Sequence, residues 1–349
     1  MTTNYLDIFN GVMSKKKNTD LNDKILIIDG LNTFMRSHAA NPLMNDNGIH
    51  IGGIVGFLSS IGYAIKLIQP TRVIIVFDGK NGSQKRLSLF PEYKANRKNK
   101  PFKPNKFFQT EQEERQAMKQ QLMRLMEYLN NLPVQILIAH NCEADDIIAY
   151  LVTKHFVEDS MDKYIMSSDQ DFLQLVSKNI TVWSPTKKIF FDVNNFTEKV
   201  GMPVENFLMG KVLMGDAGDG IPGIKGMGYK TLQKHFPLLL ENTKKDIFDV
   251  YEYSKFNDST KYKIYKEVSN NLDKLKLNYE LMQLHNIELD EHAMIMLNNA
   301  LTKPINSLNK LNIYRMVIED MMNTSNIFKD PDTWLRTVWT TLDFCAKKL

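Results

Sequence analysis

Acidic side chains follow four successive apolar runs of this chain. The runs at 24–29, 72–78, 134–140 and 163–168 are rich in β-branched residues, which predicts buried strands. Asp29 closes the first run and Asp78 the second, and the acids that follow the third and fourth are Glu143, Asp145, Asp146, Asp169 and Asp171. Because the carboxyl ends of parallel strands meet at one edge of a sheet, we expect these carboxylates to converge.

Carboxylates crowded into one place repel one another strongly unless cations lie among them. The sequence segments around these acids supply only Lys80. Hard oxygen ligands without His or Cys favour magnesium or manganese, and the number of ligands favours two ions, an arrangement used for in-line displacement at phosphorus. A local interpretation competes with this one: Glu143, Asp145 and Asp146 would be ordinary first-turn acids, stabilised by the dipole of a helix that begins there.

A glycine-rich segment at 215–236 carries two further acids, Asp216 and Asp219. Pro222 fixes a turn in it, and a helix is predicted to begin near Tyr229. Glycines let a backbone approach a phosphate closely, and the free N–H groups at a helix start favour anions. The segment therefore predicts a sequence-independent clamp on a duplex backbone, unless it is only a flexible loop before an ordinary helix.

The stretch from Lys80 to Lys106 is strongly basic. It holds nine Lys or Arg residues and a single acid, Glu92. Its three prolines, Pro91, Pro101 and Pro104, argue against one uninterrupted helix. The stretch is either a solvated loop or a mobile element that grips phosphate.

Helical stretches at 52–68, 110–129 and 143–156 alternate with the predicted strands, and a fifth strand is predicted at 180–184. This alternation predicts an α/β fold with a mainly parallel central sheet covered by helices on both faces. After about residue 201 the pattern becomes helical, with helices expected at 204–214 and from Asp330-Pro331 onward. We therefore expect a core at 1–200 and a helical part at 201–349. The apolar stripe of the last helix, which we interpret as core packing, comprises Leu335, Val338, Trp339 and Leu342.

Composition narrows the class of protein. The 349 residues are 43% hydrophobic, which excludes a mostly disordered chain, and the net charge of +4 is by itself uninformative. Two cysteines, Cys142 and Cys345, exclude a disulfide framework and a CxxC zinc site. The longest apolar runs are far too short to cross a membrane, and the first residues lack an apolar signal core. A reducing, cytoplasmic location is the expectation.

Five motifs occur in the order that is typical of one family. They are IIDG, VFDG, FPEYKANR, EADD followed by SSDQDF, and GDAGDGIPGIKGMGYKT, and they span Ile27 to about Phe236. The chain resembles the 5′ nuclease superfamily of bacteriophage and bacterial 5′→3′ exonucleases and flap endonucleases. Because no polymerase accompanies the motifs, it is most similar to the free-standing phage replication nucleases of RNase H type. Two departures are Gly220, where the family usually has Asn, and Leu232, where Ala is frequent.

The resemblance implies a fold and a set of residue roles. It implies a PIN-like core, a helical arch at about 80–120 through which a single strand passes, and a helix–three-turn–helix at about 204–237. Lys94 and Arg97 would stabilise charge on the scissile phosphate, Arg86 would steer the strand, and Tyr93 would stack on a base. The glycine segment would hold duplex DNA through Gly226, Gly228, Lys230 and Thr231. The metal-site acids would be Asp29, Asp78, Glu143, Asp145, Asp146, Asp169, Asp171, Asp216 and Asp219.

The resemblance further implies the reaction and its partners. Two magnesium ions, replaceable by manganese, would serve hydrolysis that leaves 5′-phosphates, and a potassium ion would bind the glycine segment. The substrates would be DNA and RNA–DNA hybrids with free 5′ ends or flaps, including the RNA primers of lagging-strand fragments. The chain would act as a monomer, with a single-strand-binding protein or clamp at the replication fork as partner.

Three alternatives differ in what they require of the sequence. A PIN-like single-strand endoribonuclease shares the strand-end acids but lacks the arch and the glycine segment. A non-catalytic DNA-structure-binding protein would lack some of the acids, whereas all nine are present. A phosphatase with an aspartate nucleophile needs a second Asp two residues after Asp29, where this chain has Leu31.

Overall fold

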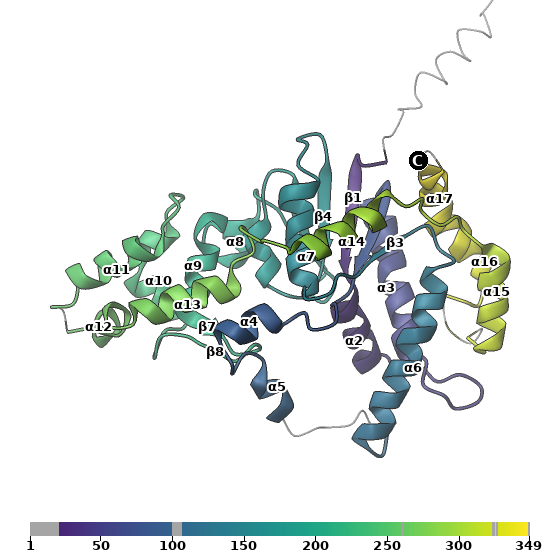
Figure 1. Cartoon of the computed structure of the whole chain (residues 1–349), viewed down its shortest axis with the longest axis horizontal. Coiled ribbons are helices and arrows are strands. Elements are labelled where there is room, and N and C mark those ends of the chain that lie inside the picture. The colour runs from purple at the N-terminus through teal and green to yellow at the C-terminus, as the bar shows by residue number, and fades with distance from the viewer. Residues whose placement is uncertain (1–20, 100–106, 260, 323–324, 326, 348–349) are drawn as a thin grey trace, which may run out of the picture.

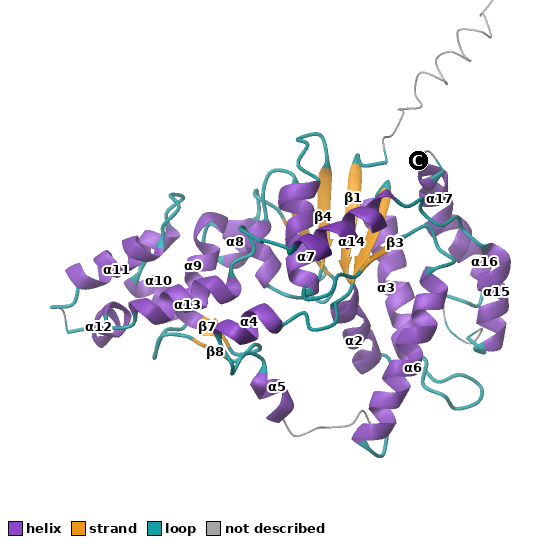
Figure 2. Cartoon of the chain, viewed as in Figure 1, coloured by secondary structure: helices purple, strands orange, loops and turns teal. Residues whose placement is uncertain are grey.

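The computed structural model describes residues 21–99, 107–259, 261–322, 325 and 327–347 (Figures 1 and 2). A six-stranded sheet in the order β3-β2-β1-β4-β5-β6 forms its centre, and every neighbouring pair is parallel except β5 and β6. The strands are β1 (Lys24–Asp29), β2 (Arg72–Val76), β3 (Gln135–Leu137), β4 (Asp162–Met166), β5 (Ile180–Ser184) and β6 (Ile189–Phe191). The mainly parallel sheet predicted from the sequence is confirmed.

Three of the predicted strands end earlier than expected: β2 and β4 end two residues early, at Val76 and Met166, and β3 ends three residues early, at Leu137. The third was expected over 134–140 but pairs only at Gln135–Leu137, because it lies at the edge of the sheet and its chain turns away toward the next helix. The antiparallel β6 was not predicted. It pairs with β5 through a short turn at 185–188, and its three residues are too few for a periodic signal.

Successive residues of β1 alternate between two hydrophobic cores, as the pleat requires. Ile25 and Ile27 belong to one core and Leu26 and Ile28 to the other, and all four are fully buried. One face of the sheet carries α2 (Gly30–Ala40), α3 (Gly52–Ile68) and α6 (Glu111–Leu129). The other carries α7 (Ala144–Tyr150), which continues as the π-helical η1 (Leu151–His155), and the 3-10 helix η2 (Asp171–Leu175).

A group of helices extends from one side of the sheet (Figure 1). Its members are α8 (Phe196–Val200), α9 (Val204–Met214), α10 (Tyr229–His235), η3 (Pro237–Leu240), α11 (Ile247–Phe256), α12 (Lys263–Ser269) and α13 (Leu272–Met282). The predicted helix at 204–214 and the helix start near Tyr229 both appear. Between α9 and α10 the glycine segment forms a two-stranded hairpin, β7 (Gly215–Asp216) with β8 (Ile221–Pro222).

The end of the chain returns to the sheet, whereas the sequence placed it with the helical part. The segments are α14 (Glu291–Thr302), α15 (Lys310–Glu319), α16 (Pro331–Trp334), η4 (Leu335–Trp339) and α17 (Thr340–Ala346). Trp339 and Leu335 are fully buried in the same core as α3, so the apolar stripe does pack in the core. The Asp330 side chain caps this last helical stretch by accepting from the Thr333 N–H, as predicted. Helical periodicity alone carried no information about which face of the molecule these helices cover.

The predicted arch is described only in part. Its helices α4 (Gln84–Leu89) and α5 (Ala95–Asn99) precede α6, but Lys100, Lys103 and Lys106 lie outside the described residues. Within the described residues, no helix is both long and apolar enough to cross a membrane.

Candidate active site

The carboxyl edge of the sheet carries a cavity of about 320 Å³. Four strands, β3, β2, β1 and β4, are adjacent in the sheet, and the acids that follow them meet at this edge. The titratable side chains that line the cavity are Asp29, Asp78, Asp145, Asp169, Asp219, Lys94 and Arg97. Of the seven strand-end acids that were expected to converge, four line the cavity, namely Asp29, Asp78, Asp145 and Asp169. Asp219 of the glycine segment and two cationic side chains join them.

Asp29 and Asp78 reach the cavity because each also caps a helix. Asp29 accepts from the Asn32 N–H at 3.1 Å, at the start of α2, and its second oxygen accepts from the Ser167 hydroxyl at 3.0 Å. Asp78 accepts from the Ala144 N–H at 2.8 Å, at the start of α7. These hydrogen bonds hold the side chains at the sheet edge. Capping a helix and a chemical role are thus compatible for these two acids, whereas the sequence analysis treated them as alternatives for Glu143, Asp145 and Asp146.

Burial and repulsion between carboxylates both affect the pKa values of Asp29 and Asp145. Burial, together with the carboxylates of Asp78 and Asp169, raises the pKa of Asp29 to about 7. Burial and the carboxylates of Asp169 and Asp29 raise the pKa of Asp145 well above its usual range. Neither Asp29 nor Asp145 forms an ion pair with a described residue. The cavity is therefore short of positive charge.

The donor set of the cavity fits hard divalent cations. Its acids offer carboxylate oxygens without His or Cys, which suits magnesium or manganese and not zinc. As they stand in the described part of the chain, no three acidic, imidazole or thiol side chains are arranged so that they could hold a metal ion together. An ion held here by Asp29, Asp78, Asp145, Asp169 or Asp219 would therefore keep several water ligands, as magnesium usually does.

Glu143 and Asp146 do not line the cavity and are instead neutralised by Arg86. The Arg86 guanidinium donates to Glu143 Oε2 at 2.6 Å and to both Asp146 oxygens at 2.8 and 3.0 Å, and its Nε donates to the Leu281 carbonyl oxygen at 3.0 Å. Burial alone would raise the pKa of Glu143, but Arg86 and Lys94 outweigh it and hold that pKa below its ordinary value. Glu143 and Asp146 therefore have Arg86 as their cation. The sequence analysis missed this partner, because it considered only the segments next to the acids, where Lys80 is the one cation.

Arg86 and Tyr93 lie beneath the surface, contrary to the roles that the resemblance implied. Arg86 is 7% exposed, so it is not placed to steer a strand across the surface. Tyr93 is 3% exposed, and its hydroxyl donates to Glu143 and Asp219, each at 3.0 Å. A ring so enclosed offers no face on which a base could stack. Both side chains tie the segment at 84–99 to the acids of α7 and of the glycine hairpin.

Lys94 and Arg97 do face the cavity. Lys94 has a left-handed backbone, φ 60°, which its N–H stabilises by donating to the Asp219 carbonyl oxygen at 2.8 Å. Its ammonium group forms an ion pair with Glu143. Arg97 is half-exposed and forms an ion pair with Asp219. Both cations are thus held at the rim, within reach of an anion that enters the cavity.

Asp171 and Asp216 share a different cation, Lys211 of α9. The Lys211 ammonium group contacts both carboxylates, the one of Asp216 at 2.6 Å. Burial opposes the charged form of Lys211, but the two acids outweigh it and raise its pKa above the ordinary value. Burial raises the pKa of Asp171 to about 6 in spite of this pairing. Lys211 was not identified from the sequence, since a single lysine within a helix carries no distinctive signal.

The glycine hairpin is tightly built on the side of α13. Gly215 has φ 75°, and a Cβ there would lie 2.2 Å from the Gly223 nitrogen, so only glycine fits. From α13, Asn278 donates to the carbonyl oxygens of Val212 and Pro222, and Lys274 donates to that of Gly223. These two residues, too distant in sequence to be predicted, orient the hairpin.

Gly220, where relatives usually have Asn, has φ 74°, a conformation that glycine and asparagine both tolerate. The turn keeps its hydrogen bonds without an amide there. Asp216 accepts from the N–H groups of Gly218 and Asp219, and Asn96 donates to the Ala217 carbonyl oxygen at 2.6 Å. With glycine at this position, Asp219 still lines the cavity.

The outer part of the segment is open. Gly226 has φ 80°, and added Cβ atoms at Gly226 and Gly228 would meet nothing within 4 Å. Lys230 is exposed and Thr231 half-buried in the first turn of α10. These four residues lie together on an accessible turn, apart from the five acids of the cavity.

Comparison with known proteins gives concordant results. The family model of the 5′-3′ exonuclease N-terminal resolvase-like domain matches residues 24–201. Flap endonuclease Xni of Shewanella denitrificans is 36% identical over 208 residues, 59% of this chain and 74% of that protein. A 5′-3′ exonuclease of Buchnera aphidicola is 29% identical over 300 residues, 84% of this chain and 96% of that protein.

A solved structure shares the fold. The bacteriophage T5 flap endonuclease, in a pseudo-enzyme–product complex with DNA and metal ions, matches with a TM-score of 0.59 and 20% identity. The match covers 86% of this chain and 99% of that one. It extends beyond the region of the family model and so includes helices that follow the sheet.

Proposed function

Because this chain belongs to the 5′-3′ exonuclease family, we propose that it is a structure-specific 5′ nuclease that cleaves at free 5′ ends and 5′ flaps. One observation carries the proposal: five carboxylates and two cationic side chains line a single cavity at the carboxyl edge of the sheet. The carboxylates suit divalent cations, and Lys94 and Arg97 suit a phosphodiester. The reaction is hydrolysis that leaves a 5′-phosphate and a 3′-hydroxyl.

We assign the metal site to Asp29, Asp78, Asp145, Asp169 and Asp219, with two magnesium ions that manganese can replace. The unbalanced charge of the cavity supports this assignment, as does the presence of metal ions in the T5 relative. When bound, such ions promote ionisation of water and neutralise charge on the leaving oxygen. Glu143, Asp146, Asp171 and Asp216 act beside this set, because protein cations already neutralise them.

Lys94 and Arg97 bind the scissile phosphate in this mechanism. In the present structure their partners are Glu143 and Asp219. An entering phosphate competes for both cations, and charge that develops on its oxygens in the transition state strengthens the contact. Because the Lys94 backbone is already fixed by Asp219, the ammonium group needs only a side-chain rotation to exchange one anion for the other.

The substrate is duplex DNA, or an RNA–DNA hybrid, with a single-stranded 5′ end. The open turn with Gly226, Gly228, Lys230 and Thr231 contacts the duplex backbone, where a potassium ion would assist, and the basic stretch at 80–106 receives the single strand. Removal of RNA primers during replication follows from this specificity, with a single-strand-binding protein or clamp as a partner at the fork.

The test uses a labelled 5′ flap and a nicked RNA–DNA hybrid, each with magnesium. Cleavage that stops in EDTA, yields 5′-phosphorylated products and is lost in Asp78→Asn would support the proposal. Undiminished cleavage by Asp78→Asn would contradict the metal assignment, and products from unstructured RNA alone would favour a single-strand endoribonuclease.

A further inference from the structure

Exposed lysines continue beyond the glycine turn, along α10 and to the start of α12. The chain carries no acidic residue from Gly220 to Leu240. Within that segment Lys230, which the proposed function already uses, is followed by Lys234 in the same helix, and Lys261 stands two residues before α12. These residues lie beyond the region at 24–201 that the family model matches.

Both lysines of α10 lie on the face that points away from the interior. Leu232 is fully buried, and Lys230 and Lys234 lie two residues before and after it, about 200° around the helix. Residues at i and i+4 share one face of a helix, so the two exposed lysines lie one above the other, about 6 Å apart along the axis. That separation is about two steps of 3.4 Å along one strand of a duplex.

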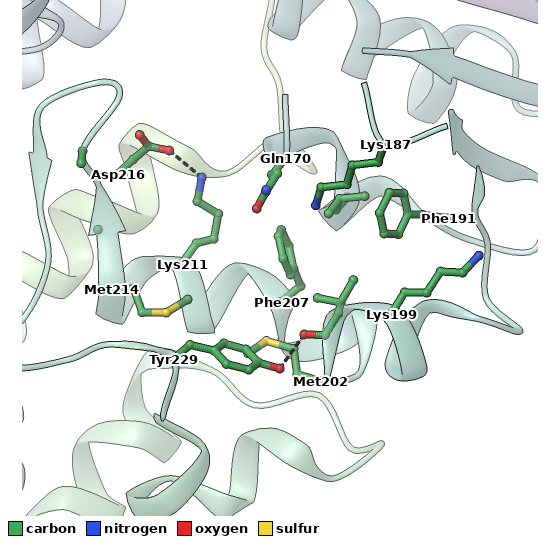
Figure 3. A pocket seen from close by; sticks show the side chains of 14 residues that line it. Gln170, Lys187, Phe191, Lys199, Met202, Phe207, Lys211, Met214, Asp216 and Tyr229 are labelled. Carbon is green, nitrogen blue, oxygen red and sulfur yellow. Dashed lines mark hydrogen bonds and ion pairs between the residues drawn. The ribbon is translucent and has the colours of Figure 1, made fainter. Parts of the chain in front are cut away.

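Contacts with its neighbours hold α10 at both ends. At its start, the Tyr229 hydroxyl donates to the Val200 carbonyl oxygen of α8 at 2.5 Å (Figure 3). At its end, the Tyr265 hydroxyl of α12 donates to the His235 carbonyl oxygen at 3.1 Å. The helix is therefore fixed against both α8 and α12, and its two lysines keep a defined position relative to α12.

One aromatic ring gathers the next two cations. The ammonium nitrogens of Lys234 and Lys261 lie 5.9 and 5.4 Å from the ring centroid of Tyr262, which is 40% exposed. The His235 ring packs against the same ring at 4.7 Å. Neither lysine forms an ion pair with a described residue, Asp258 included. Two positive charges on one exposed ring, with no carboxylate to balance them, suit an anion that contacts both.

The position of this pair indicates which anion it contacts. Lys230 lies in the first turn of α10, beside the open glycine turn, and Lys234 lies one helical turn further on the same face. A duplex backbone that is held at Lys230 and runs along α10 therefore reaches Lys234 and then Lys261. An acidic protein segment would also suit two lysines, but the continuity with Lys230 favours the duplex.

We propose that Lys234 and Lys261, positioned by Tyr262, form a second contact with the duplex backbone beyond the glycine turn. Ammonium groups bind phosphates of any sequence, so the contact is independent of sequence. The inference rests on the proposed function and adds a requirement to it: full affinity needs a duplex long enough to reach both contacts.

The experiment measures the dissociation constant of the full chain in EDTA for substrates with a single-stranded 5′ arm. Their duplex is shortened by one base pair at a time from the end away from the arm. We expect affinity to fall about tenfold within a window of a few base pairs, where the duplex ceases to reach Lys234 and Lys261.

The Lys234→Ala/Lys261→Ala double variant provides the decisive comparison. It should bind the longest duplex about tenfold more weakly and the shortest with unchanged affinity. With the longest duplex, the slope of log affinity against log salt concentration should become shallower by about two, because two phosphate contacts are lost. Lys310→Ala, an exposed lysine of α15 at the opposite end of the molecule, is the control and should change neither quantity (Figure 1).

Two variants test the ring. Tyr262→Phe keeps it and should bind every duplex as the unmodified chain does, whereas Tyr262→Ala should lose part of the dependence on length. Like behaviour of these two variants would remove the ring from the contact. An equal loss by the double variant on every duplex length or on the single-stranded arm alone, or an unaltered salt slope, would overturn the inference. Cleavage of the shortest substrate with magnesium tests the proposed function separately, because it does not need the second contact.

Discussion

The acids of this site form two groups that differ in their surroundings: one group has cationic partners and the other has none among the described residues. The cavity group, Asp29, Asp78, Asp145 and Asp169, faces one opening and forms no ion pair with a described residue. The paired group, Glu143, Asp146, Asp171 and Asp216, is neutralised by Arg86 or by Lys211, with Lys94 also on Glu143. Asp145 and Asp146 are neighbours in sequence and fall into different groups.

The difference separates two uses of a carboxylate. In the paired group each acid compensates a buried cation, so the group connects α4, α7, η2 and α9 into a fixed frame. In the cavity group, burial and neighbouring carboxylates raise the pKa values of Asp29 and Asp145, and added protons or cations relieve this repulsion. Acids of the same type therefore stabilise the frame in one group and line the cavity in the other. Substitutions at neighbouring positions, such as 145 and 146, should consequently affect different properties.

The largest effect is expected from Asp145→Asn set against Asp146→Asn. Loss of a cavity acid should slow cleavage of a labelled flap by about a thousandfold or more, which corresponds to about 4 kcal/mol in the barrier. The free energy of unfolding in EDTA should not fall, because repulsion is relieved. Asp146→Asn should lower that free energy instead. Single-turnover cleavage measures the rate and urea unfolding measures the stability. If both variants changed the rate and the stability to the same extent, the division into a cavity group and a paired group would be wrong.

Arg86→Ala tests the frame directly. Removing this guanidinium leaves Glu143 and Asp146 buried without their main cation, so the free energy of unfolding should fall by about 3–5 kcal/mol. Denaturant unfolding in EDTA measures it. Lys85→Ala, an exposed basic neighbour in α4, should change stability by less than about 0.5 kcal/mol. A mild effect of Arg86→Ala would mean that the pairing contributes little to the fold.

The pH dependence of stability without metal should reveal the cavity group. Asp29 has a pKa of about 7 when folded, above its ordinary value of 3.8, so the folded state keeps a proton that the unfolded state loses. Its contribution to stability is therefore present below about pH 4 and is lost as the pH rises to 7, by at most about 1.4 kcal/mol per pH unit. Unfolding of the unmodified chain and of Asp29→Asn in EDTA at several pH values should show a steeper decline for the former. Parallel curves would contradict the assignment.

Lys94→Ala should have the smallest of these effects and should separate chemistry from binding. Because its ammonium group acts on developing charge, cleavage should slow about a hundredfold, or about 2.7 kcal/mol. The dissociation constant of the flap in EDTA should change by less than about threefold. Lys178→Ala, an exposed lysine outside the basic stretch and outside the cavity, is the control and should leave the rate nearly unchanged. A loss confined to binding would remove Lys94 from the reaction.

Segments with a clear pattern of apolar residues could be predicted from the sequence, because that pattern by itself indicates which residues are buried. The strands at 24–29 and 180–184 and the helices at 52–68 and 204–214 appear with the expected bounds. The return of α14–α17 to the sheet was not predictable. An apolar stripe indicates that one face of a helix is buried, but it does not indicate which element covers that face. The same holds for Asn278 and Lys274, whose contacts with the glycine hairpin cross more than 50 residues of sequence.

The sequence by itself determined which acids reach the edge of the sheet, because strand ends and parallel pairing follow from local apolar runs. It also fixed the chemistry of the donor groups, since these are carboxylate oxygens without His or Cys, which suit hard cations. Only the tertiary structure decided which acids remain unbalanced. Arg86 reaches Glu143 and Asp146 across 57 and 60 residues, and Lys211 reaches Asp171 across 40. Electrostatic energy depends on separation in space and on burial, and neither quantity is set by distance along the chain.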